Sequence, residues 1–187
     1  MKLTGSYEIP IDKKTVWEAL NNPDILKESI PGCDKFEKIS DTSFTATATN
    51  KIGPFNASFS GEVELKDINP PDNYKIFGQG NSTVGFASGE AFVELTESDG
   101  KTTLSYTVEA NVGGKIAQVG SRLIDMTAKK MADIFFGKFS ELVTPEDKKS
   151  ILLDELKDNS KLSNNKIIYF SVIIAVFACL AIYSFYK

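Results

Sequence analysis

The residues that decide the fold are 101–136, KTTLSYTVEANVGGKIAQVGSRLIDMTAKKMADIFF. Apolar and polar side chains alternate from Leu104 to Val112, which is the period of a strand with one covered face. After a Gly-Gly pair the apolar residues recur every three or four positions, a pattern typical of an amphipathic helix. The stretch therefore predicts a strand followed by a long helix that runs to about Leu142 and lies across a sheet. The apolar stripe of this helix is predicted to be Ile116, Gly120, Leu123, Ile124, Thr127, Met131, Ile134 and Phe135.

Upstream, the sequence predicts one strand, two short helices and five further strands. Residues 2–9 alternate like a strand, Asp12 suits the N-cap of a first helix, and Asn22 with Pro23 suits the start of a second. Residues typical of turns then separate the later strands at 40–41, 53–54, 70–73 and 98–100, and residues 78–89 are predicted to form a hairpin.

This order of elements predicts an α+β fold of the helix-grip type, in which a curved antiparallel sheet wraps around a long C-terminal helix. Small residues recur on the predicted inner face of the sheet: Ala46, Ala48, Ala57, Gly61, Gly89, Ala91 and Ala110. Such residues either leave a hollow between sheet and helix or let the helix approach closely and fill the core. The pattern alone leaves both arrangements open.

The C-terminal tail is predicted to add one transmembrane helix. Residues 167–186, IIYFSVIIAVFACLAIYSFY, carry no charge and would span about 30 Å as a helix, the thickness of the hydrocarbon layer. The preceding residues are polar and mixed in charge. The expected domains are therefore a ligand-binding head at 1–143, a tether at 144–166 and the membrane helix at 167–186. Residues expected along the anchor are Ile167, Phe170, Ile173, Val176, Leu180 and Tyr183.

The head is expected on the cytoplasmic side of the membrane. The N-terminal residues MKLTGSYEIP lack the apolar segment of a secretory signal peptide. Lys161 and Lys166 precede the predicted span and only Lys187 follows it, a weak positive-inside bias. The expected localisation is the cytoplasmic membrane, with a single C-terminal anchor.

Composition excludes several classes of function. Residues 1–143 hold 15 Lys and Arg against 20 Asp and Glu, a net charge of −5, so the basic surface that nucleic acids require is missing. The chain has no histidine, which excludes Ser-His-Asp and Cys-His catalysis and imidazole-bound metals. We expect no catalytic residues, no metal site and no cofactor.

Two isolated features have simpler explanations than catalysis. Cys33 has no histidine to activate it and no second cysteine nearby, so a turn position is favoured over a reactive thiol. Arg122 and Asp125 lie three residues apart on the predicted helix, which favours a surface ion pair over a catalytic pair.

Three separated blocks of sequence resemble one known family. They are VWEALNNPDILKESIPGC from Val16, KIGPFNASFSGEVEL from Lys51 and VGGKIAQVGSRLIDMTAKKMADIFF from Val112. In this order they resemble the CoxG family of carbon monoxide dehydrogenase subunits, within the START/SRPBCC superfamily of ligand-binding proteins. The resemblance covers essentially the whole head, and the C-terminal span also matches many members. The tether departs from the family, where longer Ala- and Pro-rich tethers are common.

The resemblance implies a membrane-anchored accessory protein rather than an enzyme. Such a protein would recruit a molybdenum-containing oxidoreductase, such as carbon monoxide dehydrogenase, to the membrane and bind an apolar ligand, a quinone or a lipid, in the hollow. Tyr106 and Thr127 would orient a quinone ring. The alternatives are a cyclase- or aromatase-like enzyme, which needs inward-facing acids or bases, and a ligand-free docking scaffold. The residues predicted to line the hollow are Trp17, Phe59, Tyr106, Leu123, Thr127, Met131 and Phe135.

Overall fold

The computed structural model describes residues 1–146, of which Met1–Thr144 form one compact unit. The elements of this unit follow the predicted order of one strand, two short helices, further strands and a long helix. The strands are β1 (Lys2–Ile9), β2 (Cys33–Lys38), β3 (Ser43–Ile52), β4 (Phe55–Asn69), β5 (Asn73–Ser82), β6 (Gly85–Ser98) and β7 (Lys101–Gly113). The helices are α1 (Lys13–Leu20), α2 (Pro23–Ser29), the 3₁₀ helix η1 (Lys115–Val119) and α3 (Ser121–Val143).

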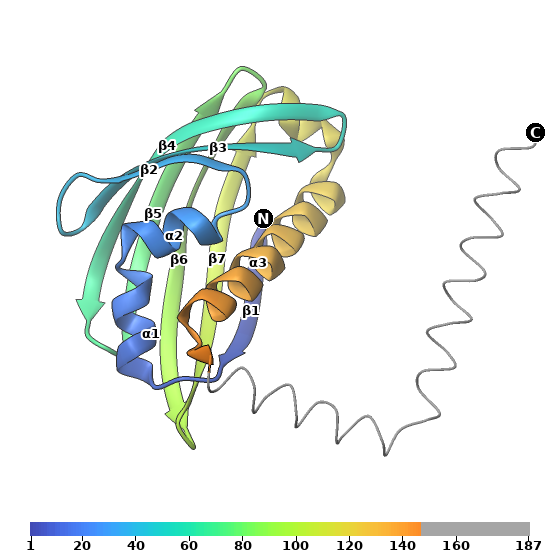
Figure 1. Cartoon of the computed structure of the whole chain (residues 1–187). Coiled ribbons are helices and arrows are strands. Elements are labelled where there is room, and N and C mark those ends of the chain that lie inside the picture. The colour runs from blue at the N-terminus through green and yellow to red at the C-terminus, as the bar shows by residue number, and fades with distance from the viewer. Residues whose placement is uncertain (147–187) are drawn as a thin grey trace, which may run out of the picture. The chain divides into compact units, whose positions relative to one another are not determined.

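These strands form one antiparallel sheet in the order β1-β7-β6-β5-β4-β3-β2. Hairpins join the strands from β2 to β7, and β1 pairs with β7, where Gly5 lies opposite Tyr106. Figure 1 shows the sheet bending around α3, with α1 and α2 on the same side of the sheet as α3. The predicted curved antiparallel sheet and long C-terminal helix are therefore confirmed, as is the hairpin within residues 78–89.

The two short helices begin where the sequence predicts. The Asp12 carboxylate accepts the backbone N–H of Thr15 at 2.9 Å and satisfies a donor that the first turn of α1 leaves free. Asn22 accepts the N–H of Asp24 at 3.0 Å at the start of α2. Pro23 occupies the first turn of α2, where its missing N–H costs nothing. The caps thus fix where α1 meets β6 and β7 and where α2 meets α3.

The long helix begins later than the sequence predicts. Lys115–Val119 form the separate helix η1, and α3 starts at Ser121. Gly120 between them has a φ of 90°, a conformation open to glycine and costly for other residues, and it ends the first helix. Ile116 is buried in η1 and not on α3. The expectation of one continuous helical stripe through Ile116 and Gly120 is therefore wrong.

The core-facing side of α3 also differs from the predicted stripe. Phe139 is fully buried, whereas Ile134, which the stripe includes, is 46% exposed. One residue corresponds to a rotation of about 100° around a helix, and apolar residues on several sides of α3 allow more than one choice of face. The stripe is therefore wrong at Ile134 and omits Phe139. The other α3 residues packed against the core are Ala132, Phe135, Phe136 and Val143.

The core occupies one end of the space between the helices and the sheet. A polar group inside it is satisfied, because the Thr102 hydroxyl donates to the carbonyl of Ile11 at 2.7 Å. This end is closed, so a ligand site must lie elsewhere. The buried members of the core are Ile9, Ile11, Val16, Ala19, Leu20, Tyr74, Val93, Leu95, Leu104, Tyr106 and Phe139.

Within residues 1–146, the structure contains no helix that is long and apolar enough to span a membrane. The predicted span at 167–186, with its anchor residues from Ile167 to Tyr183, lies outside the described residues, as does the tether from residue 147 onward. These boundaries and the anchor stay predictions.

Candidate functional site

The candidate site lies between α3 and the inner face of the sheet, the face turned toward α3. The strand register defines this face, because Tyr106 on β7 lies beside Val93 on β6, which lies beside Tyr74 on β5. All three side chains are buried in the core under the helices. Residues two, four or six positions away along the same strands therefore point toward the helices as well.

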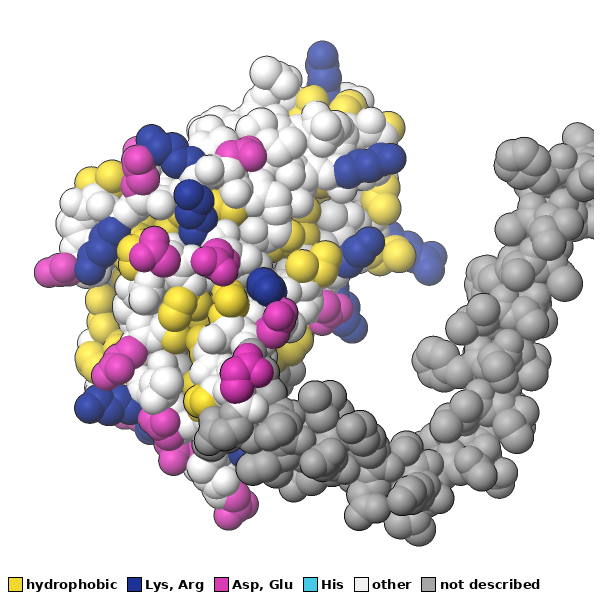
Figure 2. Space-filling view, in the orientation of Figure 1, with side chains coloured by type: hydrophobic (Ala, Val, Ile, Leu, Met, Phe, Trp, Pro, Cys, Tyr) yellow, Lys and Arg dark blue, Asp and Glu magenta, His cyan; other side chains and the backbone are white. Residues whose placement is uncertain are grey.

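Away from the core, the inner face carries small residues that remain partly accessible. We call these residues the open half of the inner face. Part of this exposure lies on the outer face of the sheet, where Ala46, Gly61, Gly78 and Gly89 border surface grooves. On the inner face, residues of this size place at most a methyl group toward α3. Figure 2 shows hydrophobic side chains reaching the surface on the side that carries the helices. This arrangement favours a hollow at this end. Half-buried members of the open half are Ala46, Ala48, Gly61, Gly78, Gly80, Ala87, Gly89, Ala91 and Ala110.

The seven residues predicted to line the hollow lie in different parts of the structure, some in or beside the core and some near the β3–β4 turn. Tyr106 is 9% exposed and belongs to the core, and Trp17 meets Tyr74 edge-on with ring centroids 5.3 Å apart. Leu123 lies against the β3–β4 turn, where a Cβ on Gly53 would be 3.0 Å from the Leu123 methyl group. The set therefore spans both ends of the inner space, and its role as a lining stays a prediction. The half-buried members are Trp17, Phe59, Leu123, Thr127, Met131 and Phe135.

An aromatic cluster forms the boundary between the core and the open half. Phe136 on α3 stacks on Tyr7 at 4.3 Å between ring centroids and on Tyr106 at 5.8 Å. Phe135 meets Phe136 edge-on at 4.9 Å. The sequence did not predict Tyr7 or Phe136 as site residues. Tyr7 comes to lie beneath α3 only because β1 pairs with β7. The alternation of Tyr7 with polar neighbours in β1 was the signal that could have found it.

The hydroxyl of Tyr7 is tied to α3. It donates a hydrogen bond of 2.6 Å to Oδ1 of Asp133. Burial raises the pKa of the Tyr7 phenol, and the hydrogen bond to Asp133 raises it further. The hydroxyl of Thr127, predicted to orient a ligand, donates to the carbonyl of Leu123 at 2.8 Å. Thr127 can therefore offer a ligand only its acceptor lone pairs.

Asp125 differs most from its predicted role. The expected ion pair with Arg122 is wrong, because Arg122 is exposed and Asp125 forms no ion pair within the described part of the chain. Oδ1 of Asp125 is buried and has no hydrogen-bond partner among residues 1–146. The sequence gives a weak signal for this position, since Asp125 lies seven residues before Ala132, which is partly buried against the core, and thus on the same side of α3.

Cys33 shows no sign of reactivity. It is the first residue of β2, just after Pro31 and Gly32, and burial raises the pKa of its thiol. A raised pKa lowers the fraction of reactive thiolate. Within residues 1–146 no group of three or more Cys, Asp or Glu side chains is arranged to hold a metal ion.

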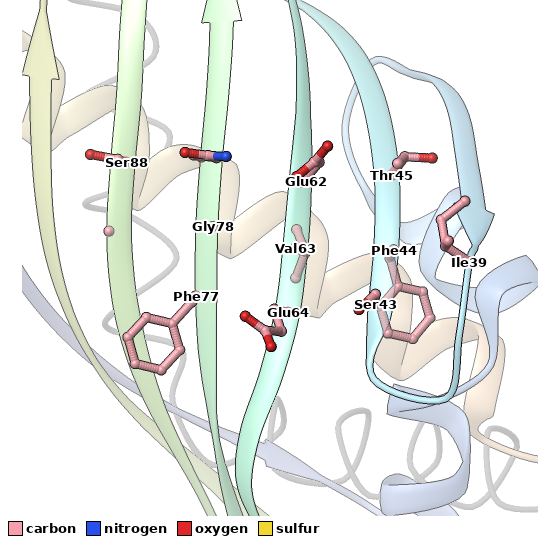
Figure 3. A pocket seen from close by; sticks show the side chains of 12 residues that line it. Ile39, Ser43, Phe44, Thr45, Glu62, Val63, Glu64, Phe77, Gly78 and Ser88 are labelled. Atoms are coloured by element: carbon pink, nitrogen blue, oxygen red, sulfur yellow. The ribbon is translucent and has the colours of Figure 1, made fainter.

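A second hollow lies on the outer face of the sheet. It is a groove of about 640 Å³ that crosses β3 to β6. Figure 3 shows Glu62, Glu64 and Phe77 on the side of the strands opposite α3. Lys66 lies over the Phe77 ring, with its nitrogen 4.6 Å from the centroid. The groove is open to solvent and mixes apolar side chains with the carboxylates of Glu62 and Glu64. The sequence did not predict it.

Comparison with known proteins identifies the family. A sequence model that describes the CoxG subunit of carbon monoxide dehydrogenase matches residues 5–144. The chain belongs to this CoxG family. The match covers nearly the whole compact unit, so the predicted family is confirmed, and its description names a subunit of carbon monoxide dehydrogenase. No curated protein matches the chain.

Solved structures place the CoxG head among START-like folds. A conserved protein from Geobacillus kaustophilus is 33% identical, with a TM-score of 0.73 over 76% of this chain and 95% of that one. A START superfamily protein from Mycobacterium smegmatis is 9% identical, with a TM-score of 0.60 over 76% of this chain and 96% of that one. The protein TTHA0849 from Thermus thermophilus is 12% identical, with a TM-score of 0.60 over 76% and 97%. The last two likenesses concern the fold alone. Family and fold together indicate a ligand-binding accessory protein.

Proposed function

We propose that this protein is a membrane-anchored accessory protein that binds an apolar ligand, a quinone or a lipid, and recruits a carbon monoxide dehydrogenase-type molybdenum oxidoreductase to the cytoplasmic membrane. The observation that carries the ligand part is the open half of the inner face, where only glycine and alanine face α3, in a member of the CoxG family. The recruitment part rests on the family description. The anchor part rests on the uncharged residues 167–186.

The chemistry of the inner space supports an apolar ligand. Alanine and glycine place at most a methyl group over the inner face of the sheet, and the rings of Tyr7, Tyr106 and Phe136 pack together at its border with the core. Each Å² of apolar surface that a ligand buries there contributes about 25 cal/mol. Flat rings also gain from offset or edge-on contact with aromatic side chains. A quinone head group and a lipid chain both meet these requirements.

The predicted anchor would hold this site where such ligands dissolve. Quinones and lipids are concentrated in the bilayer, and a tether limited to residues 144–166 keeps the head within a short reach of it. An oxidoreductase bound to the same head would then share this local supply. One protein would thus both bind the ligand and recruit the oxidoreductase.

Native mass spectrometry tests the ligand part. Residues 1–146 contain the complete compact unit and its core, so this head is expected to fold without the tail. The head is incubated with a lipid extract that contains quinones, and the mass of any bound molecule is measured. A stoichiometric quinone or lipid is expected. A head that stays empty at saturating quinone and lipid would contradict the ligand part.

Membrane fractionation tests the anchor and the recruitment. The full chain and the chain lacking residues 167–187 are each expressed beside the oxidoreductase. The full chain is expected to carry the oxidoreductase into the membrane fraction, and the shortened chain is expected to leave it soluble. If the shortened chain still sediments with membranes together with the oxidoreductase, the anchor is elsewhere.

A cyclase- or aromatase-like enzyme has one observation in its favour, the inward carboxylate of Asp125. Proton transfer on a bound ring usually needs a second positioned acid or base. Among residues 1–146, Oδ1 of Asp125 is the one buried side-chain polar atom left without a partner. The chemical structure of the released ligand, determined by NMR and mass, separates the two functions, since an enzyme would return an altered molecule, with unchanged mass where it only closes a ring.

A further inference from the structure

The position of Asp125 on α3 directs its carboxylate toward the sheet. Positions 7, 11 and 14 residues further along a helix lie within about 40° of the direction of the starting residue. Counted from Asp125, these positions are Ala132, Phe136 and Phe139, all of which pack against the core. Asp125 therefore extends the core-facing side of α3 by two turns, beyond the aromatic cluster.

No side-chain donor in the described part of the chain reaches Oδ1 of Asp125. The start of α3 lies at the end of the sheet where Leu123 meets the β3–β4 turn at Gly53. The inner-face residues toward this end of β6 and β7 are apolar, among them Ala91, Val108 and Ala110. The backbone groups of these strands are already paired in the sheet. The cation nearest in sequence, Arg122, is exposed and forms no ion pair with Asp125.

A buried carboxylate oxygen without a donor is costly. Buried polar atoms in folded proteins nearly always have a hydrogen-bond partner, and the rare exceptions mark a place for a water, an ion or a ligand. The Oδ1 atom of Asp125 is such an exception in the described part of the chain. A ligand in the hollow that carries a hydrogen-bond donor would satisfy this oxygen.

We propose that Asp125 accepts a hydrogen bond from a hydroxyl group of the apolar ligand, so that the site prefers the hydroquinone form of a quinone to its oxidised form. This inference rests on the proposed ligand function. An ionised carboxylate can only accept hydrogen bonds, and both oxygens of a quinone can only accept as well. A hydroquinone has two hydroxyl donors on the same ring. A charge-assisted bond to Oδ1 therefore forms with the reduced molecule alone.

The test compares three ligands of nearly identical shape on the head 1–146. They are duroquinone, durohydroquinone and the dimethyl ether of durohydroquinone, which keeps the ring and lacks the donors. Dissociation constants are measured anaerobically at neutral pH. The wild-type head is expected to bind durohydroquinone about ten-fold or more tightly than either of the others. A diacylglycerol, which also carries one hydroxyl on an apolar body, is measured in parallel to distinguish a lipid from a quinone as the source of the donor.

The variant Asp125→Asn isolates the carboxylate. It keeps the shape, can donate to a quinone oxygen, and is expected to abolish the preference for durohydroquinone. Glu141→Gln is the matched control, because it removes one negative charge from an exposed position of the same helix and is expected to keep the preference.

The outcomes separate this inference from the proposed function. If the wild-type head binds durohydroquinone and duroquinone equally, or if Asp125→Asn keeps the wild-type preference, the inference is wrong while the ligand function stands. If the wild-type head binds none of the ligands, both are overturned. Diacylglycerol binding that depends on Asp125, with no binding of durohydroquinone, would keep the donor to Asp125 and reject the quinone preference.

Discussion

Tyr7 on β1 and Asp133 on α3, 126 positions apart in the sequence, are joined by a hydrogen bond of 2.6 Å from the phenol to Oδ1. The bond holds the ring of Tyr7 flat against Phe136, with centroids 4.3 Å apart. It thereby fixes α3 over the edge strand at the boundary of the open half. The contact lies near the surface, so its contribution to stability is modest and measurable.

The first prediction concerns this bond. Tyr7→Phe keeps the stacked ring and removes the hydroxyl, so the free energy of unfolding is expected to fall by about 1 kcal/mol. Urea unfolding measures the change. In a background that already carries Asp133→Ala, the same substitution is expected to cost almost nothing. An equal cost in both backgrounds would show that the hydrogen bond does not stabilise the fold.

The second prediction concerns alkaline pH. Burial raises the pKa of Tyr74, and burial together with the bond to Asp133 raises that of Tyr7. In the unfolded chain both phenols ionise near pH 10, before the folded protein releases these protons. Their stabilising effect is therefore complete below about pH 10 and is lost as the pH rises further, by at most about 1.4 kcal/mol per pH unit for each phenol.

Urea unfolding between about pH 9 and pH 11 measures this decline. Tyr74→Phe is expected to make it shallower, because Tyr74 is buried and its pKa is raised by burial alone. A Tyr74→Phe variant with the wild-type slope would contradict the assignment. The more exposed Tyr7 is expected to contribute less, owing to screening by solvent.

The third prediction tests which side of α3 faces the core. Phe139→Ala removes a fully buried ring and is expected to cost about 3 to 5 kcal/mol. Ile134→Ala on the same helix removes a side chain that is 46% exposed and is expected to cost less than about 1 kcal/mol. Thermal or urea unfolding compares the two. The predicted apolar stripe would require the opposite order, since it includes Ile134 and omits Phe139.

The fourth prediction fills the hollow from the sheet. Gly78 lies on the inner face of β5, and a Cβ there would meet its nearest neighbour, the carbonyl of Glu62, at 3.9 Å, an ordinary contact. Gly78→Leu is therefore expected to fold and to weaken ligand binding by about ten-fold or more, because the leucine occupies the ligand volume. Gln79→Leu adds the same side chain on the opposite, exposed face. Equal ligand affinity in the two variants would place the ligand away from the open half.

Local signals in the sequence predicted most of the fold. The alternation from Leu104 to Val112, the caps at Asp12 and Asn22 and the hairpin within residues 78–89 each depend on residues close together in the chain. Chain neighbours also pair in this sheet from β2 to β7, so local turns define nearly all of its order. The order of these elements also predicted that the sheet curves around the long helix.

The candidate site was predicted less completely, because it depends on contacts across the chain. Apolar residues surround much of α3, and the pattern favoured Ile134 although the packed side contains Phe136 and Phe139. Tyr7 joins the aromatic cluster only when β1 pairs with β7. The outer groove arises from the bend of four neighbouring strands, which no single stretch of sequence encodes.

The sequence by itself determined the order of the strands and helices, the family, and the exclusion of histidine chemistry, since periodicity, turn residues and composition are properties of the chain. Tertiary structure alone decided that Oδ1 of Asp125 is buried and that Ile134 is exposed. Burial depends on which side of a helix meets the sheet, and that side is chosen by the packing of all its residues together. The sequence pattern assigned Asp125 to a surface ion pair, and the packing left its Oδ1 buried without a partner among residues 1–146.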